Sequence, residues 1–207
     1  MFSLFKKKKQ PESGFTESVW VSTAAKYEAI QRFAQANSSQ PVWLLYHFAD
    51  TASALEQVLN ALNTPCQLIQ RMNDAKQPGT ASLLPASSIV GQLQSFSGTA
   101  QPRILVVEHY PLQARDVELA AALNQLFPGA EIQQYIGLDE PIMALFDSER
   151  LMNLLERMGV ERNEAISHSM VTKSIGRALT RIAKSATGDA AAKSQQEWFD
   201  RNVPPGS

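Results

Sequence analysis

Residues 41–48, with the sequence PVWLLYHF, form the feature that most constrains the fold of this chain. The run is short and almost entirely apolar, which is typical of a central strand buried on both faces of a parallel sheet. A second strand of this kind is predicted at residues 104–108. Helical patterns flank both runs, so strands and helices alternate along the chain. This alternation predicts an α/β fold, with a mainly parallel sheet covered by helices on both faces.

Periodicity and turn residues give the remaining expected elements. Strands are expected at residues 19–22, 64–69 and 131–136, and helices at residues 24–36, 87–93, 114–126, 141–146, 147–158 and 163–184. Residues 73–82 and 95–101 are expected to be loops. Thr23 is the expected N-cap of the first helix, and Asp50 or Thr51 that of the helix after the first central strand. On the helix at residues 114–126, four side chains are expected to face the core: Val117, Ala121, Leu123 and Leu126.

Composition indicates one ordinary globular domain. The chain has 207 residues, of which 44% are hydrophobic and 19% charged, and its net charge of −1 gives no general attraction to nucleic acid. The single cysteine, Cys66, has no partner for an internal disulfide. We find no secretory signal and no apolar run near eighteen residues, so a cytoplasmic location is expected, with peripheral contact at the inner membrane as a further possibility.

Several motifs in the second half of the chain follow one another in an order found in a known family. They are Leu138-Asp139-Glu140, Met143-Ala144-Leu145-Phe146, Met158-Gly159-Val160, Glu164-Ala165-Ile166-Ser167-His168 and Val171-Thr172-Lys173-Ser174-Ile175. This succession resembles the end of the second nucleotide-binding domain of the SecA preprotein translocase ATPases and the start of the helix that follows it. The likeness covers residues 17–185. It implies a three-layer RecA-like (P-loop NTPase-like) fold with a long C-terminal helix, a flexible basic tail at residues 1–16 and a flexible tail at residues 186–207.

The motifs that serve ATP hydrolysis in that family are missing. The chain has no G-x-x-x-x-G-K-S/T phosphate cradle. The family carries phosphate-facing arginines on the helix that corresponds to residues 116–127, which here read DVELAAALNQLF. Its glycine-rich motif has no counterpart at residues 86–93. The resemblance therefore implies a degenerate, stand-alone second domain that is not an enzyme and needs no cofactor.

Three polar residues at predicted strand ends are candidates for ligand binding. His47 follows the first central strand, and Glu108 and His109 follow the second. The carboxyl ends of strands in open α/β sheets are common ligand sites, and a histidine beside a carboxylate can act as an acid–base pair. The alternative is that these residues only cap strands and hold loops. Positions 47, 66, 109 and 168 lack the short paired spacings of a zinc site, so no metal is expected.

Two further regions could contact a membrane or a partner. Phe2, Leu4 and Phe5 precede Lys6, Lys7, Lys8 and Lys9, a pattern that fits either an anionic membrane surface or a solubilising tail. Lys173, Arg177 and Arg181 recur at helical spacing and form either a partner-binding stripe or a solvated face. Trp198 either contacts a partner or folds back on the domain.

These observations lead to an expected function with one alternative. The chain is expected to be a non-catalytic SecA-like binding or regulatory module linked to protein translocation, with SecA itself or the translocon as partner and no nucleic acid. The alternative is a nucleotide or small-molecule binding protein that re-uses the crevice around His47, Glu108 and His109.

Overall fold

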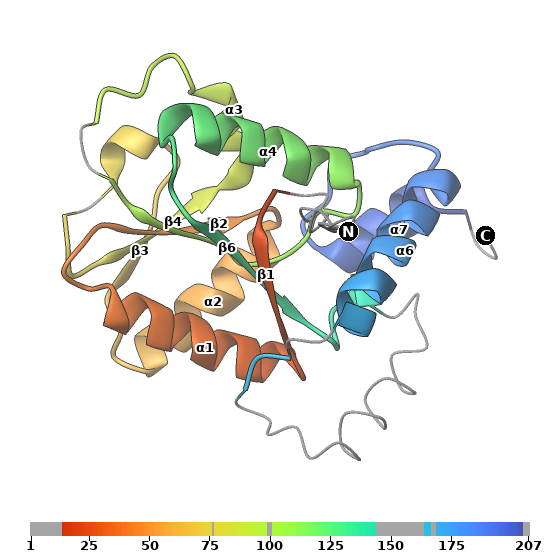
Figure 1. Cartoon of the computed structure of the whole chain (residues 1–207), viewed down its shortest axis with the longest axis horizontal. Coiled ribbons are helices and arrows are strands. Elements are labelled where there is room, and N and C mark those ends of the chain that lie inside the picture. Colours follow the sequence, from red (N-terminus) through yellow and green to blue (C-terminus); the bar gives the residue numbers. More distant parts are fainter. Residues whose placement is uncertain (1–13, 76, 99–100, 144–163, 167–168, 205–207) are drawn as a thin grey trace, which may run out of the picture.

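The computed structural model of the chain describes residues 14–75, 77–98, 101–143, 164–166 and 169–204 (Figure 1). Its centre is a six-stranded sheet with the order β1-β6-β5-β2-β4-β3, and every pairing between neighbouring strands is parallel. The strands are β1 (Thr16–Trp20), β2 (Val42–Tyr46), β3 (Cys66–Leu68), β4 (Ala81–Pro85), β5 (Arg103–Val106) and β6 (Ile132–Gly137). The predicted α/β class and the RecA-like layering are confirmed.

Helices cover both faces of the sheet. Figure 1 shows α1 (Thr23–Ala36) and α2 (Ala49–Ala61) below the sheet and α3 (Ala86–Gly91) and α4 (Gln113–Leu126) above it. Two 3-10 turns, η1 (Met72–Asp74) and η2 (Pro141–Met143), follow β3 and β6. Two further helices, α6 (Ser169–Ser185) and α7 (Gln195–Asn202), complete the described chain.

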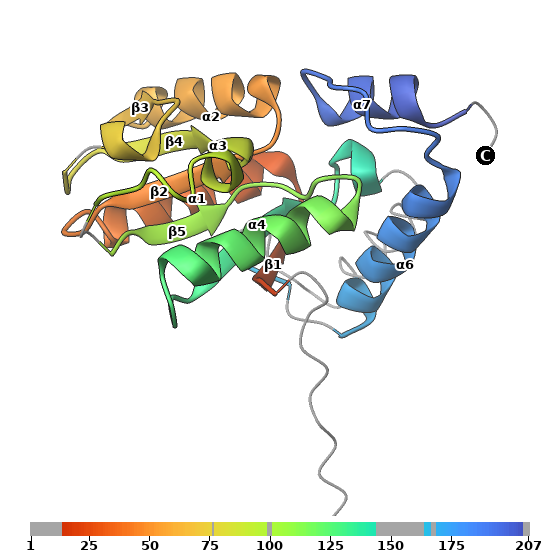
Figure 2. The ribbon, with the colours of Figure 1, turned by 90° about the horizontal axis from the view of Figure 1, so that it is seen from above.

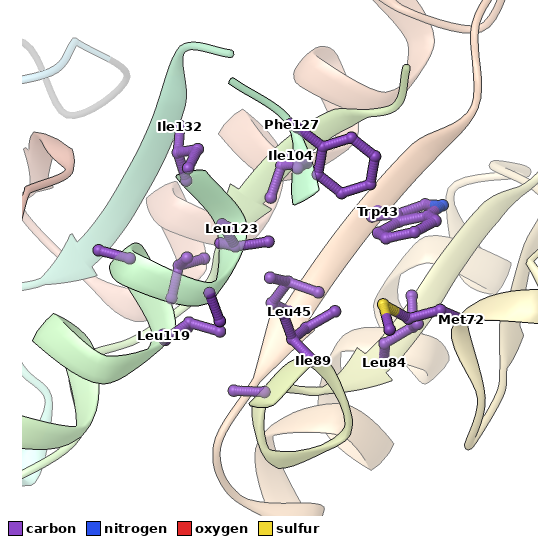
Figure 3. Close-up of a cluster of buried hydrophobic side chains, with 14 of the residues drawn as sticks. Trp43, Leu45, Met72, Leu84, Ile89, Ile104, Leu119, Leu123, Phe127 and Ile132 are labelled. Carbon is purple, nitrogen blue, oxygen red and sulfur yellow. The ribbon is translucent and has the colours of Figure 1, made fainter. Parts of the chain in front are cut away.

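The side chains of β2 alternate between two hydrophobic clusters, which explains why its sequence is apolar throughout. Trp43 and Leu45 point to the face of α3 and α4, where they join Ile104, Leu119 and Leu123 (Figure 3). Val42, Leu44 and Tyr46 point to the opposite face and pack with residues of α1 and α2, among them Ile30, Leu55 and Leu59. All five β2 residues are buried because the strand lies in the middle of a sheet with two covered faces.

A third cluster joins α6 and α7 to the carboxyl end of the sheet. Figure 2 shows both helices beyond the ends of the strands rather than on a face of the sheet. Val171, Ile175, Leu179 and Ile182 repeat every three to four residues along α6 and pack against Ile136, Ile142 and the fully buried Trp198. The carboxyl-terminal edge of the sheet is therefore covered by the last part of the chain.

Several expected element bounds were wrong. Ala81 and Ser82, placed in a loop, begin strand β4, and Ser22 rather than Thr23 caps α1 through its bond from Ala25 N. The N-cap residue of α2 is Phe48, so neither Asp50 nor Thr51 holds that position. The helix expected at residues 141–146 is only the turn η2 within the described range, and the helix expected at residues 147–158 lies outside it.

The buried face of α4 also differs from the expected one. Val117 is 45% exposed and Ala121 is exposed, whereas Asp116, Leu119, Ala120 and Leu123 are buried. Leu123 is buried as expected, but spacing of apolar residues could not place a carboxylate inward, and here Asp116 faces the core while Val117 faces solvent.

The C-terminal region forms more structure than expected. Helix α7 lies within residues 186–207, where a tail was expected, and its start is capped by Ser194 through a bond from Glu197 N. Within the described ranges, no helix combines the length and the apolar character needed to cross a membrane.

Candidate functional site

The carboxyl ends of β2 and β5 bring the three predicted ligand residues together. His47 follows β2, while Glu108 and His109 follow β5, the neighbouring strand. A fourth residue, Asp116 on α4, joins them and was not expected from the sequence. Its position seven residues after His109, next to apolar helix residues, offered no pattern that distinguished it from an exposed carboxylate.

Asp116 bridges the two histidines. Its Oδ1 lies 2.9 Å from His47 Nε2, and its Oδ2 lies 2.7 Å from His109 Nδ1. The side chain is fully buried. Burial alone would raise the pKa of this carboxyl, but the hydrogen bonds from His109 and His47 outweigh it and hold the pKa well below its usual range. The carboxylate is therefore charged over the whole physiological range and fixes both imidazole rings.

His109 is a buried histidine surrounded by acceptors. Burial favours the neutral ring, but the hydrogen bond and the charge of Asp116 outweigh burial and raise the pKa of His109. Glu17 adds to this effect, since its Oε1 lies 3.6 Å from His109 Nε2. The ring is enclosed on both sides by carboxylates and does not reach solvent.

Glu108 holds the start of α2. Its Oε1 accepts bonds from the backbone N–H groups of His47 and Phe48 at 2.8 and 3.0 Å, and its Oε2 accepts the hydroxyl of Thr51 at 2.7 Å. Burial raises the pKa of Glu108, and these donors together with nearby cations oppose the rise. Glu108 therefore lies at the N-terminus of α2, where a negative charge is favoured, and binds the N–H groups of the two residues that precede the helix.

A buried ion pair lies behind this cluster. Lys26 Nζ donates to Glu140 Oε1 at 2.5 Å and to the carbonyl oxygen of Val107 at 2.9 Å. Gly137 N also donates to Glu140 Oε1, at 2.7 Å. Burial would lower the pKa of Lys26, but the charge of Glu140 outweighs it and the pKa is raised. One sequence feature could have indicated that Lys26 is buried. It lies four residues before the core residue Ile30 and therefore shares its face of α1.

The C-terminal segment is tied to the same edge through Asp189. Its Oδ1 accepts Tyr110 Oη at 2.5 Å and Trp198 Nε1 at 2.9 Å, and its Oδ2 accepts Arg115 Nε and Nη2 at 3.0 and 2.8 Å. Burial would raise the pKa of Asp189, but these donors lower it overall.

Gln195 adds a second attachment, because its side chain forms hydrogen bonds with two backbone groups at this edge of the sheet. Its Oε1 accepts Ile142 N at 3.2 Å and its Nε2 donates to the carbonyl of His109 at 2.9 Å. Asp50 N donates to the carbonyl of Lys193 at 3.0 Å, which adds a third. Residues 189–198 therefore cross the strand ends as a strap bound at several points.

The geometry favours a structural role for the predicted trio. Glu108 and His109 are buried and hydrogen-bonded, and only His47 lines an open cavity. Among the described residues, no group of three His, Cys, Asp or Glu side chains could hold a metal ion. The arrangement is suited to binding a small molecule, because the cavity beside His47 combines apolar walls with a few charged groups.

The other predicted contact residues have different fates. Lys173, Arg177 and Arg181 are exposed on α6, opposite its buried stripe. Trp198 is fully buried, so it folds back on the domain, the second of its two alternatives. The N-terminal contact residues Phe2, Leu4, Phe5, Lys6, Lys7, Lys8 and Lys9 lie outside the described residues.

Comparison with known proteins agrees with the motifs, although no family model matches the chain. The protein translocase subunit SecA of Flavobacterium psychrophilum is 25% identical over 166 residues, which covers 73% of this chain. SecA of Cytophaga hutchinsonii is 24% identical over 189 residues, 83% of the chain. Over most of its length, the chain is therefore similar in sequence to SecA. SecA of Acidithiobacillus ferrooxidans reaches 44% identity, within a segment of 48 residues.

The SecA-like chain spans only a small part of these relatives. It covers 15% of the Flavobacterium psychrophilum protein and 17% of the Cytophaga hutchinsonii protein. Among solved structures, the C-terminal part of the Fun30 ATPase domain matches 77% of this chain and 54% of its own, at 14% identity and a TM-score of 0.40. A match at that score carries no argument, so the RecA-like layering of the SecA-like chain rests on its own all-parallel sheet.

Proposed function

We propose that this chain is a non-catalytic SecA-like domain that acts as a binding or regulatory module in protein translocation. The observation that carries the proposal is the strap over the strand ends. Asp189 and Gln195 bind the C-terminal segment to the edge of the sheet where ligands of open α/β proteins bind, and Trp198 packs into the hydrophobic cluster beside it. A chain whose own segment occupies this edge is poorly arranged to share a nucleotide there with a second domain.

The charges near this edge give independent support. Stabilising a transferring phosphoryl group needs cations and N–H donors that face it. Lys26 is buried against Glu140, and Arg115 is bound to Asp189 and Glu118. Helix α4, where the resemblance implied arginines, packs Leu119, Ala120 and Leu123 into the core instead. The cations near the edge are therefore engaged with carboxylates of the same chain.

The link to translocation rests on the relatives, which are named as translocase subunits. By that resemblance the candidate partners are SecA, the translocon, or the first nucleotide-binding domain of a related motor. The exposed cations Lys173, Arg177 and Arg181 on α6 provide a candidate contact surface, because α6 contains no acidic residue to neutralise them.

The proposal is tested by measuring ATP hydrolysis and thermal unfolding with ATP, ADP and Mg²⁺, first on the purified chain and then with purified SecA. We expect no hydrolysis and no nucleotide-dependent shift for the chain alone, and a complex with SecA by analytical ultracentrifugation. A ligand that binds the folded chain and is present at a free concentration of about a hundred times its Kd stabilises it by about 2.7 kcal/mol. Thermal unfolding detects a change of that size.

A charge-reversal pair refines the test. Replacing Lys173, Arg177 and Arg181 with Glu should weaken the complex, whereas replacing Arg32, Arg71 and Arg103, three exposed cations elsewhere, should not. Hydrolysis by the purified chain would overturn the non-catalytic assignment. Failure to bind SecA, the translocon or the isolated first nucleotide-binding domain would overturn the role in translocation.

A further inference from the structure

A cavity of about 470 Å³ lies between the strap and the ends of β2, β4 and β5. Its walls are mainly apolar and come from Phe48, Val90 and Leu119, together with Ala191 and Ala192 of the strap. Its volume lies within the range of about 300–1,000 Å³ that is typical of small-molecule sites. The cavity is distinct from the buried polar cluster, because neither Glu108 nor His109 lines it.

The guanidinium of Arg115, which lines this cavity, is already paired with carboxylates of the chain. All three nitrogens of the Arg115 guanidinium donate to carboxylates: Nε and Nη2 to Asp189, and Nη1 to Glu118 at 3.3 Å. Both oxygens of Asp189 accept two bonds each. A ligand anion would have to break these pairs in order to gain a partner.

The lining carries more negative than positive charge. Glu118 and Asp189 face one guanidinium, and within the described ranges the half-exposed Glu118 receives only the long bond from Arg115 Nη1. Glu118 therefore retains acceptor capacity toward the cavity mouth. A positively charged group is favoured there, and a carboxylate or phosphate is repelled.

The strap forms one wall of this site. Ala191 and Ala192 lie two and three residues after Asp189, and their small side chains leave space that longer side chains would fill. Because Asp189 holds the strap to Tyr110 and Arg115, the wall is fixed in position before any ligand binds. A pre-formed site loses less entropy on binding.

We propose that this cavity binds a small apolar molecule that carries one cationic amine, with its apolar body against Phe48, Val90 and Leu119 and its amine at Glu118. The proposal is independent of the translocation role, since it concerns the cavity and not the surface of α6.

The test uses two probes of the same shape and opposite charge, phenethylamine and phenylacetate. Each is titrated into the ¹⁵N-labelled full chain and followed by amide chemical shifts. We expect saturable shifts with phenethylamine at residues 47–48, 90–91, 110 and 189–192, and at least fivefold weaker binding of phenylacetate. Equal or tighter binding of phenylacetate, shifts elsewhere, or no binding of phenethylamine would each overturn the proposal.

Matched variants locate the site. Val90→Trp should fill the cavity and abolish the phenethylamine shifts, while Leu62→Trp, at an exposed position on the far end of α2, should leave them intact. If Val90→Trp unfolds the chain, Ala192→Leu fills the same space from the strap. Glu118→Gln should weaken the binding of phenethylamine by about two- to fivefold, as expected for loss of a solvent-exposed ion pair. Glu131→Gln should leave this binding unchanged. Unchanged binding in the filling variants would also refute the site, whatever the outcome with SecA.

Discussion

At the scale of single residues, Asp116 is the point on which the polar cluster depends. One buried carboxylate fixes His47 and His109, which arrive from two different strands. The strand-end rule found both histidines from the sequence, because it depends only on where apolar runs stop. The rule could not find Asp116, since the reason for its burial is the pair of imidazoles that the fold brings to it.

The raised pKa of His109 predicts a pH dependence of stability. A group whose pKa is higher in the folded chain stabilises fully below its unfolded pKa, here about 6.5, and that contribution is lost as pH rises through the folded value. We therefore expect the His109 contribution to the free energy of unfolding to fall above pH 6.5, by at most about 1.4 kcal/mol per pH unit for one proton.

Replacing Asp116 with Asn tests the cause of this effect. Without the Asp116 carboxylate, only the charges of Glu17 and Glu140 oppose the effect of burial on the pKa of His109, so the slope above pH 6.5 should become clearly shallower. Urea unfolding between pH 5.5 and 9 measures the pH dependence of the free energy of unfolding. Asp200→Asn, which removes an exposed carboxylate, is the control. An unchanged slope in Asp116→Asn would mean that another group causes it.

The Lys26–Glu140 pair predicts a strongly non-additive result. Lys26→Met leaves a buried carboxylate that still accepts from Gly137 N at its Oε1, and should cost about 3–5 kcal/mol. The double variant Lys26→Met, Glu140→Leu removes both charges and should be more stable than Lys26→Met alone. A double-mutant cycle by urea unfolding checks this, and simple additivity would contradict it.

At the scale of elements, the errors of sequence reasoning have specific causes. Strands β2 and β5 were predicted because central parallel strands are apolar throughout. Strand β4 was placed partly in a loop because a Gly- and Pro-containing stretch precedes it. Helix α7 has a polar sequence, QQEWFDRN, that hides its one buried aromatic residue. Ser194 followed by Glu197 was nevertheless a capping-box pattern that indicated a helix start.

Trp198 anchors helix α7, so we expect the stability of the chain to depend strongly on this side chain. The side chain is fully buried in the third cluster and donates to Asp189. Trp198→Ala should lower the free energy of unfolding by about 3–5 kcal/mol, because it removes a large buried side chain and a bonded N–H. Gln196→Ala, at an exposed position on the same helix, should change it by less than about 0.5 kcal/mol. Equal effects of the two changes would mean that α7 is not packed as described.

At the scale of the whole molecule, the three tryptophans report on three different clusters. Trp43 lies in the cluster of α3 and α4, Trp198 in that of α6 and α7, and Trp20 in a small cluster beside α1. The cluster of α6 and α7 includes Val19, Phe48 and Ile136, which belong to the sheet or follow it directly. The C-terminal layer therefore shares its core with the rest of the domain.

This sharing predicts one cooperative unfolding transition. With 5-fluorotryptophan incorporated, the native ¹⁹F resonances of Trp20, Trp43 and Trp198 should disappear at the same urea concentration. Earlier loss of the Trp198 resonance would instead identify α6 and α7 as a separately unfolding layer.

The pairing of the first strand with the last gives the chain a particular order of assembly. Among the strands of the described ranges, β1 pairs with β6 alone, with Thr16 opposite Gln133 and Trp20 opposite Gly137. On a ribosome, β1 emerges long before its partner has been synthesised. Its apolar residues Val19 and Trp20 have no neighbouring strand until β6 follows, so the nascent chain exposes an unpaired strand until β6 has been synthesised.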